Sequence, residues 1–238
     1  QPQIQEPTST NISEAPTPTI SNRRIIQKNQ LRYKAIHMDR RQINDGSLQP
    51  TASFRKFATW NIEGFSLDKL VTLEYYMKLY SIDLLCIQET HICESDHFIT
   101  EDGSLVIFAG TTGWNFAGVG FIVSPKLRKA VHSFDCPNGR MAAIKIRVTG
   151  GKVAFFSVYT PPNDHAVEER TLFFSQLEEF YMNTSMNGEK YICVYLNARL
   201  RCRYANEGSI IGEHFFRGIR KHPEVPANRN LVAQFCHT

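Results

Sequence analysis

The stretch IDLLCIQETH, Ile82–His91, decides the fold because it joins a buried strand to a polar strand end. Its apolar run, residues 84–87, is short and unbroken, which favours a strand buried on both faces over a helix. Polar residues 88–91 follow at once. A carboxylate just past the carboxyl end of such a strand has a fixed position, so Glu89 is a candidate for chemistry. The alternative is that Glu89 only begins a solvated loop.

A β-α-β unit is predicted around this strand. Residues 57–62, FATWNI, are rich in β-formers and are followed by a turn at Glu63 and Gly64. Ser66 is suited to cap a helix that returns the chain to the central strand. The two strands are therefore expected to be parallel, with a right-handed crossover. The apolar face of the helix is predicted to consist of Leu67, Leu70, Val71, Leu73, Met77 and Tyr80.

The pattern after residue 104 predicts strands without intervening helices, joined by short turns in an antiparallel meander. The strongest turn signal is Asn138-Gly139. The strands are expected at 105–109, 119–123, 131–134, 141–148 and 153–159, with a further turn at 114–118. A second helix capped by Asp164 should follow, then a buried strand at 191–196 and the start of a helix at 228–236. These elements imply an α/β protein with one mixed sheet or two sheets and helices on the outer faces.

The positive charge of the chain belongs to its beginning. The first 56 residues hold nine of the 27 Lys and Arg side chains and four of the 23 Asp and Glu side chains, a net charge of +5. Residues 57–238 hold the other 18 basic and 19 acidic side chains, a net charge of −1. Composition alone therefore does not make the later part a basic nucleic-acid-binding domain.

The first 53 residues are predicted to be a leader, and residues 54–238 a folded domain. Residues 1–22 are rich in Gln, Pro, Thr, Ser and Asn, which predicts disorder. The basic segment 23–41 could contact phosphates, act as a localisation signal or form a solvated linker. The candidate nucleic-acid-binding residues in it are Arg23, Arg24, Lys28 and Arg32.

Six cysteines form no CxxC pair, which argues against a zinc site and favours a reduced intracellular protein. No apolar run reaches membrane-spanning length, and no secretory signal opens the chain. We therefore expect an intracellular protein that has no membrane partner, and the nucleus is one location that we consider. We also expect the protein to be a monomer. Because Gln1 rather than Met comes first, the chain is expected to be a fragment or a processed product.

Polar residues stand at the ends of four predicted strands. They are found at 60–63, 88–91, 159–163 and 196–199. If the strands share a sheet edge, these clusters converge. A glutamate with amides and a tyrosine suits a hard cation such as Mg²⁺, which takes one or two carboxylates and leaves the remaining positions to water and phosphate. Histidine and cysteine are not where a zinc site would need them.

These segments resemble the endonuclease/exonuclease/phosphatase superfamily. The matching motifs, in chain order, are TWNIEG (59–64), IQETH (87–91), AGVGFIVSP (117–125), NGRM (138–141) and SVYTPPN (157–163). The resemblance implies a two-sheet β-sandwich flanked by helices, the DNase I-like fold. It also implies that Glu89 binds Mg²⁺ or Mn²⁺, with Asn61 beside it as a second metal-site residue. Tyr159 matches the tyrosine that contacts the phosphate, and Arg140 matches the arginine that opens a strand of the family; both are candidate catalytic residues.

Two later segments are similar to the endonuclease domains of non-LTR (LINE-type) retrotransposons. These are LNARL (196–200) and ANRNLVAQFC (227–236). The resemblance now covers residues 54–238 and implies a DNA endonuclease, with Asn197 as a catalytic residue. Each motif is weak alone, but their shared order is specific.

The chain departs from the family pattern in two places. The aspartate of the family's GDFN segment is Tyr195 here, and a tyrosine is neutral near pH 7. The chain also ends at Thr238, before the family's terminal Asp-His pair, so we expect a C-terminally truncated domain. Loss of catalytic groups usually costs orders of magnitude in rate, so weak or absent activity is expected. The lost strands would also leave an unpaired sheet edge and poor stability.

Two other functions stay open at this point. The first is a non-catalytic module that binds nucleic acid or protein. The second is a phosphatase for a small or lipid substrate, against which the two retrotransposon-like segments argue. Several residues also have a purely structural interpretation: a loop histidine for His91, a surface strand residue for Arg140, and a core aromatic for Tyr159.

Overall fold

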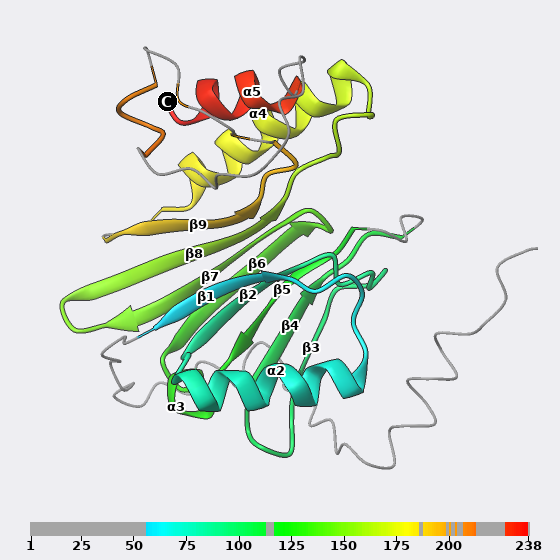
Figure 1. Cartoon of the computed structure of the whole chain (residues 1–238). Coiled ribbons are helices and arrows are strands. Elements are labelled where there is room, and N and C mark those ends of the chain that lie inside the picture. Colours follow the sequence, from blue (N-terminus) through cyan, green and yellow to red (C-terminus); the bar gives the residue numbers. More distant parts are fainter. Residues whose placement is uncertain are drawn as a thin grey trace, which may run out of the picture. The chain divides into compact units, whose positions relative to one another are not determined.

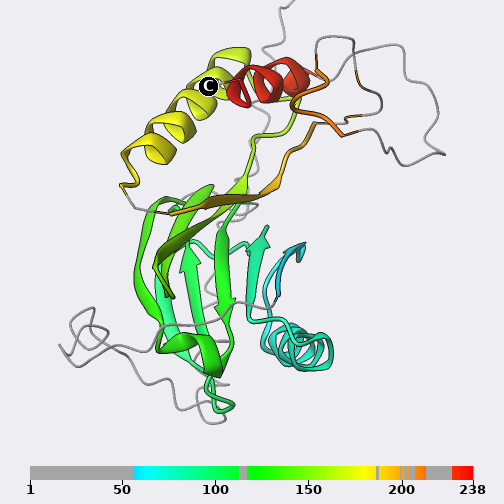
Figure 2. The ribbon, with the colours of Figure 1, turned by 90° about the vertical axis from the view of Figure 1, so that its left-hand side faces the viewer.

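Two β-sheets lie at the centre of the fold, and helices cover their outer faces (Figures 1 and 2). The computed structural model describes residues 56–112, 117–185, 188–198, 200, 203, 207–212 and 227–237. All of them belong to one compact unit, Ala35–Thr238. The first sheet has the order β1 (Phe57–Asn61), β2 (Leu84–Gln88), β5 (Val119–Val123), β4 (Leu105–Ala109), β3 (Asp96–Ile99). The second has the order β6 (Val131–Asn138), β7 (Met141–Val148), β8 (Gly151–Tyr159), β9 (Lys190–Tyr195).

One parallel pair in each sheet brings polar strand ends together. β1 and β2 are parallel, with Asn61 opposite Gln88, as the predicted β-α-β unit requires. β8 and β9 are also parallel, and Tyr159 lies opposite Tyr195. The other strand pairs are antiparallel. Because parallel strands end at the same edge of a sheet, the last residues of β1 and β2 lie side by side, and so do those of β8 and β9.

The helices are placed by their apolar residues. Helix α2 (Leu67–Tyr80) buries Leu70, Leu73 and Met77 in one cluster with β2, β4 and β5. Helix α4 (Val167–Asn183) and helix α5 (Ala227–Phe235) pack in another cluster with β7 and β8 of the second sheet. The short helix α3 (Pro125–Arg128) follows β5. No helix of the described residues is long and apolar enough to cross a membrane.

The structure confirms most predicted elements and corrects several details. Val71 and Tyr80 are exposed, because the buried stripe of α2 is narrower than predicted and takes in Glu74 instead. Asp164 does not cap α4, which begins after Ala166 without a side-chain cap. The strand predicted at 191–196 is only partly buried, because β9 lies at the edge of its sheet. Strand β3 and helix α3 were not predicted at all.

Several predictions concern residues outside the described part of the chain. These are the disordered leader, the basic candidates Arg23, Arg24, Lys28 and Arg32, and most of the turn predicted at 114–118. The domain boundaries at residues 53 and 54 also stay a prediction.

The two sheets are joined by a buried polar junction around Gln88. Its amide nitrogen donates to the Ser157 hydroxyl at 3.0 Å and to the Cys193 carbonyl at 3.4 Å. Its oxygen accepts from the Thr59 hydroxyl at 3.1 Å, and the Ser157 hydroxyl donates to the Ile87 carbonyl at 2.9 Å. Gln88 is 1% exposed and Ser157 is fully buried, so these two side chains satisfy each other where water does not reach, whereas Thr59 is exposed on β1. The junction fixes β2, and therefore Glu89, against the second sheet.

Replacing Gln88 with leucine should destabilise the domain. The change removes the hydrogen bonds of Gln88 to the buried Ser157 hydroxyl and the Cys193 carbonyl and puts an apolar group against them, so we expect a loss of about 2 kcal/mol in the free energy of unfolding. Urea unfolding followed by circular dichroism measures it. The matched control is Gln176→Leu, the same change on the exposed face of α4, which should alter stability by less than about 0.5 kcal/mol. Equal effects of the two changes would contradict the assigned role of Gln88.

Candidate active site

The carboxyl end of β2 carries Glu89 in an unusual backbone conformation. Its φ angle is +53°, in the left-handed region that non-glycine residues rarely adopt. Two more residues at neighbouring strand ends share this conformation, Glu63 at +49° and Asn197 at +45°. Such conformations cost about 1–3 kcal/mol each and persist where the surrounding structure holds them. The strand ends are therefore tightly constrained.

Backbone hydrogen bonds hold the Glu89 segment from both sides. The Gly64 and Phe65 N–H groups donate to the carbonyls of Glu89 and Thr90, at 2.6 and 2.8 Å. On the other side, the Thr90 N–H donates to the Gly118 carbonyl at 3.0 Å. A Cβ atom on Gly118 would lie 2.2 Å from the Thr90 hydroxyl, and its φ is +103°, so this close approach requires glycine.

Asn61 orients the Glu89 carboxylate. Its amide nitrogen donates to Glu89 Oε1 at 2.7 Å, while its amide oxygen accepts from the Glu63 N–H at 3.2 Å. In this arrangement Asn61 presents its nitrogen, not its oxygen, to the carboxylate. That is the geometry of a positioning group, and direct metal ligation by Asn61 remains a prediction.

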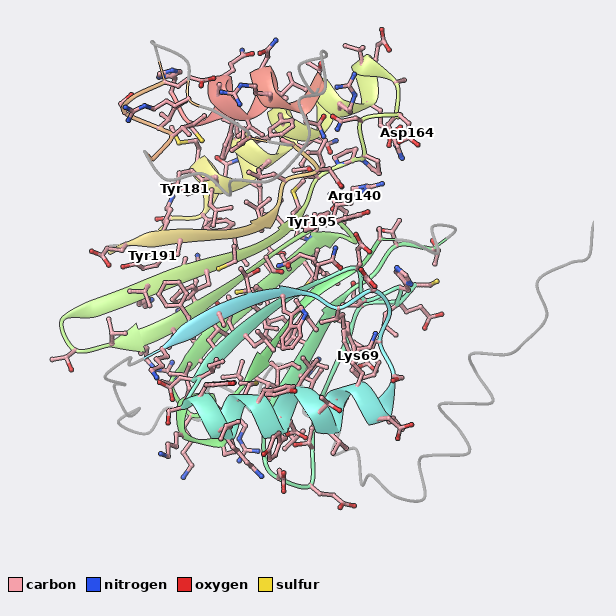
Figure 3. The ribbon with its side chains drawn as sticks, in the orientation of Figure 1. Lys69, Arg140, Asp164, Tyr181, Tyr191 and Tyr195 are labelled. Carbon is pink, nitrogen blue, oxygen red and sulfur yellow. The ribbon has the colours of Figure 1, made fainter. Side chains whose placement is uncertain are left out.

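Tyr159 links the two halves of the site. Its hydroxyl is close enough to Glu89 and Asn197 for both to affect its ionisation, and the residue is only 7% exposed. The Arg140 guanidinium lies 5.3 Å from the centre of its ring. The Tyr195 ring stacks beside it, with centroids 6.0 Å apart and planes at 27°. Figure 3 labels Arg140 and Tyr195 at this end of the second sheet. The structure thus brings together all six predicted residues: Asn61, Glu89, Arg140, Tyr159, Tyr195 and Asn197.

Burial and charge shift the ionisation of two of these groups. Burial, followed by the nearby Glu89 charge, raises the pKa of Tyr159 above its ordinary value of 10.0. Asn197 and Arg140 act in the opposite direction without cancelling the shift. Burial lowers the pKa of Arg140, while Tyr159 and Glu169 partly offset that effect. Tyr159 is therefore a neutral hydroxyl donor near pH 7, and the arginine keeps its charge there.

The raised pKa of Tyr159 predicts a loss of stability in alkali. Its unfolded-state pKa is about 10, so the folded protein binds its proton more tightly than the unfolded chain does. That contribution is complete below about pH 10 and is lost as the pH rises through the folded pKa. Ultraviolet titration of tyrosinate absorbance should show that Tyr159→Phe removes a component titrating above pH 10. Removal of a component that titrates at or below pH 10 would contradict it.

A second layer of amides holds Asn197. Its side-chain nitrogen donates to the Thr160 carbonyl at 2.7 Å, and its own carbonyl accepts from the Asn163 amide at 2.8 Å. The Asn163 oxygen accepts from the Asn228 N–H at 3.0 Å, and the Asn228 amide donates to the Pro161 carbonyl at 2.7 Å. Asn228 is fully buried. Asn163 and Asn228 both stand inside sequence motifs, but their contacts with the site were not predicted.

The residues at the site suit one hard cation that keeps several water ligands. They do not supply a complete coordination shell of protein ligands. Among the described residues, no three His, Cys, Asp or Glu side chains gather closely enough to bind a metal by themselves. Glu89 is the carboxylate that Asn61 orients at these strand ends. Mg²⁺ needs only one or two carboxylates when water and phosphate complete its shell, so the residues present fit that ion or Mn²⁺.

The arrangement of two mixed sheets, outer helices and polar strand ends is the DNase I-like fold found in AP endonucleases. The catalytic domain of Xenopus laevis APE2 is 14% identical, with 77% of this chain and 67% of that chain covered and a TM-score of 0.53. An AP endonuclease from Archaeoglobus fulgidus is 15% identical, with 77% and 70% covered and a TM-score of 0.50. At these identities the likeness establishes the fold alone.

A curated relative was found by sequence. Craniofacial development protein 2 of Bos taurus is 24% identical over 179 residues, which are 75% of this chain and 29% of that protein. The chain thus spans less than a third of the length of this relative. No protein-family model matches the chain.

Proposed function

We propose that the chain is a divalent-metal-dependent phosphodiester hydrolase domain that acts as an endonuclease on DNA. The observation that carries the proposal is the hydrogen bond from Asn61 to the Glu89 carboxylate at 2.7 Å, beside a Tyr159 hydroxyl whose ionisation both Glu89 and Asn197 affect. The shared fold of solved AP endonucleases supports the same reaction class. Mg²⁺ is the proposed cofactor, with Mn²⁺ as a substitute.

Each residue has a distinct proposed task. Mg²⁺ bound at this site would act as a Lewis acid and would stabilise negative charge on the scissile phosphate and the leaving oxygen. Glu89 holds the ion, and Asn61 keeps that carboxylate in place. Tyr159 and Asn197 donate hydrogen bonds to phosphate oxygens, and Arg140 adds positive charge beside the Tyr159 ring. These groups bind and orient a phosphodiester.

We further propose that the domain derives from a non-LTR retrotransposon. The support is the pair of segments LNARL and ANRNLVAQFC, which stand in the order of those endonucleases. Both segments take part in the site: Asn197 affects the ionisation of Tyr159, and Asn228 supports the loop beside it. The basic segment 23–41 is the proposed nuclear localisation signal, because it concentrates charge that the folded part lacks.

The proposed activity is weak, because Tyr195 replaces the family aspartate. The tyrosine is 42% exposed and stacks on Tyr159, so it contributes an aromatic surface where a carboxylate would manage the attacking water. A neutral phenol does not take a proton from water near pH 7. Binding and orientation of DNA are retained, while activation of the nucleophile is poor.

Nicking of supercoiled plasmid by the full chain tests the function. Conversion to open circles should require Mg²⁺ or Mn²⁺ and should stop when EDTA is added. Nicking that proceeds unchanged in EDTA, or soluble folded protein that never nicks at high concentration with either metal, would contradict the proposal.

A non-catalytic nucleic-acid-binding module is the second candidate, and the exposed Tyr195 in place of a carboxylate is what favours it. In that case DNA binding should survive Glu89→Ala and should weaken steeply with salt. Neutralising the basic residues of segment 23–41 should abolish it. DNA binding that is lost with Glu89→Ala would instead favour the metal-dependent enzyme.

A further inference from the structure

We infer that Lys69 is a positioning residue for Glu89: its ammonium group holds the β1–α2 turn whose backbone fixes the Glu89 segment. This inference rests on the proposed function. Lys69 lies in the first turn of α2 (Figure 3), the helix that precedes β2, and Glu89 follows at the carboxyl end of β2. Sequence patterns gave it no role.

The ammonium group of Lys69 binds three consecutive carbonyl groups. It donates to the carbonyl oxygen of Ile62, to that of Glu63 at 3.2 Å and to that of Gly64 at 2.7 Å. An ammonium group has three N–H donors and no acceptor, so these bonds use its full capacity. The contacts are partly buried for Ile62 and Gly64.

The turn needs this cation because its carbonyls converge. Glu63 and Gly64 both have left-handed backbones, with φ of +49° and +88°. Two such residues in succession point neighbouring carbonyl groups toward one side of the chain. A cation that contacts converging carbonyl oxygens offsets the repulsion between their partial negative charges. A lysine in the first turn of a helix is also disfavoured by the helix dipole, so its placement here indicates a local task.

The turn connects Lys69 to the metal-site carboxylate in two steps. The Gly64 N–H donates to the Glu89 carbonyl at 2.6 Å, which holds the left-handed backbone of Glu89. The Glu63 N–H donates to Asn61 Oδ1, and Asn61 in turn donates to the Glu89 carboxylate. Lys69 therefore acts on both the backbone and the side chain of Glu89 through residues 62–64.

Affinity for Mn²⁺ tests the inference without any measurement of activity. Free Mn²⁺ is counted by electron paramagnetic resonance while the full chain is titrated. Lys69→Met keeps the length of the stem and removes the charge, and it should weaken Mn²⁺ binding about 10-fold, as for other residues that support a metal ligand. Lys126→Met is the matched control, because Lys126 is exposed on α3, and it should leave the affinity unchanged.

Local hydrogen exchange distinguishes a positioning role from general support of the fold. In Lys69→Met the amides of Gly64 and Phe65 should exchange faster, while amides of β7 in the other sheet keep their wild-type rates. Uniformly faster exchange together with unchanged Mn²⁺ affinity would overturn the inference and leave Lys69 a residue of general stability.

Failure of the inference and failure of the proposed function give different results. If the wild type binds no Mn²⁺, or binds it as well after Glu89→Gln, the proposed metal site is wrong. If Glu89→Gln removes binding while Lys69→Met does not change it, only the role of Lys69 is wrong.

A measurement on the wild type covers the case in which Lys69→Met does not fold. The ammonium nitrogen of Lys69, observed by nuclear magnetic resonance, should be protected from solvent exchange and should shift when Mg²⁺ is added. The Gly64 amide should shift with it. A Lys69 signal that exchanges freely, or that ignores Mg²⁺ while Glu89 responds, would overturn the inference.

Discussion

Replacing Glu89 with glutamine is expected to reduce Mg²⁺-dependent plasmid nicking by at least about 1,000-fold. Glutamine keeps the shape of the side chain and can still accept the hydrogen bond from Asn61. What it loses is the negative charge, and a neutral amide holds Mg²⁺ poorly. The measurement is the initial nicking rate over a range of Mg²⁺ concentrations, together with Mn²⁺ affinity.

The control for this change is Glu168→Gln, which makes the same replacement at an exposed position of α4. It should nick at the wild-type rate. Thermal unfolding should show that both variants remain folded, because Glu89 supports no large buried surface. A Glu89→Gln protein that nicks as fast as the wild type would mean that the metal is held elsewhere or that the nicking comes from another protein.

Replacing Tyr195 with aspartate is expected to raise the nicking rate by about 100-fold. The aspartate is ionised near pH 7 and can accept a proton from water, which the tyrosine cannot. Because position 195 is 42% exposed, the new charge keeps contact with water and should not destabilise the fold greatly. Single-turnover nicking of plasmid at fixed Mg²⁺ measures the gain.

Two further variants separate the new carboxylate from the lost aromatic ring. Tyr195→Phe keeps the stacking on Tyr159 and should leave the rate unchanged. Tyr195→Asn removes the ring without adding charge and should also stay near the wild-type rate. An equal gain from Tyr195→Asn and Tyr195→Asp would show that the bulk of the tyrosine, and not the missing charge, limits the reaction.

The elements with strong local signals could be predicted from the sequence. The strands at 105–109, 119–123 and 141–148 have the predicted bounds because their apolar residues continue to the turn residues that stop them. The Ser66 cap is also confirmed, since its hydroxyl accepts from the Lys69 N–H at 3.1 Å. The convergence of Glu89 with Asn61 followed from the parallel β1–β2 pair, which the helix between them required.

The features that sequence analysis missed depend on distant partners. Glu74 is buried because its carboxylate accepts from the Thr100 hydroxyl at 2.8 Å, a contact between residues 26 positions apart. Asn228 acts through loops some 65 positions earlier in the chain. Lys69 is close in sequence to its partners. A helical pattern, however, does not predict that the side chain of a lysine will bind the carbonyl groups of the preceding turn. Such contacts are set by the tertiary structure.

The buried position of Gln88 limits what the motif IQETH says about nuclease activity. Gln88 belongs to IQETH, the segment that suggests a nuclease, yet its work is to bind the two sheets together in the core. Selection for a folded protein alone would retain it, along with the buried Ser157 to which it donates. A descendant that had abandoned cleavage for another task would still carry that glutamine. A glutamine at position 88 would therefore indicate only that the domain folds. The residues at positions 89 and 195 would indicate whether the chain has kept or lost catalysis.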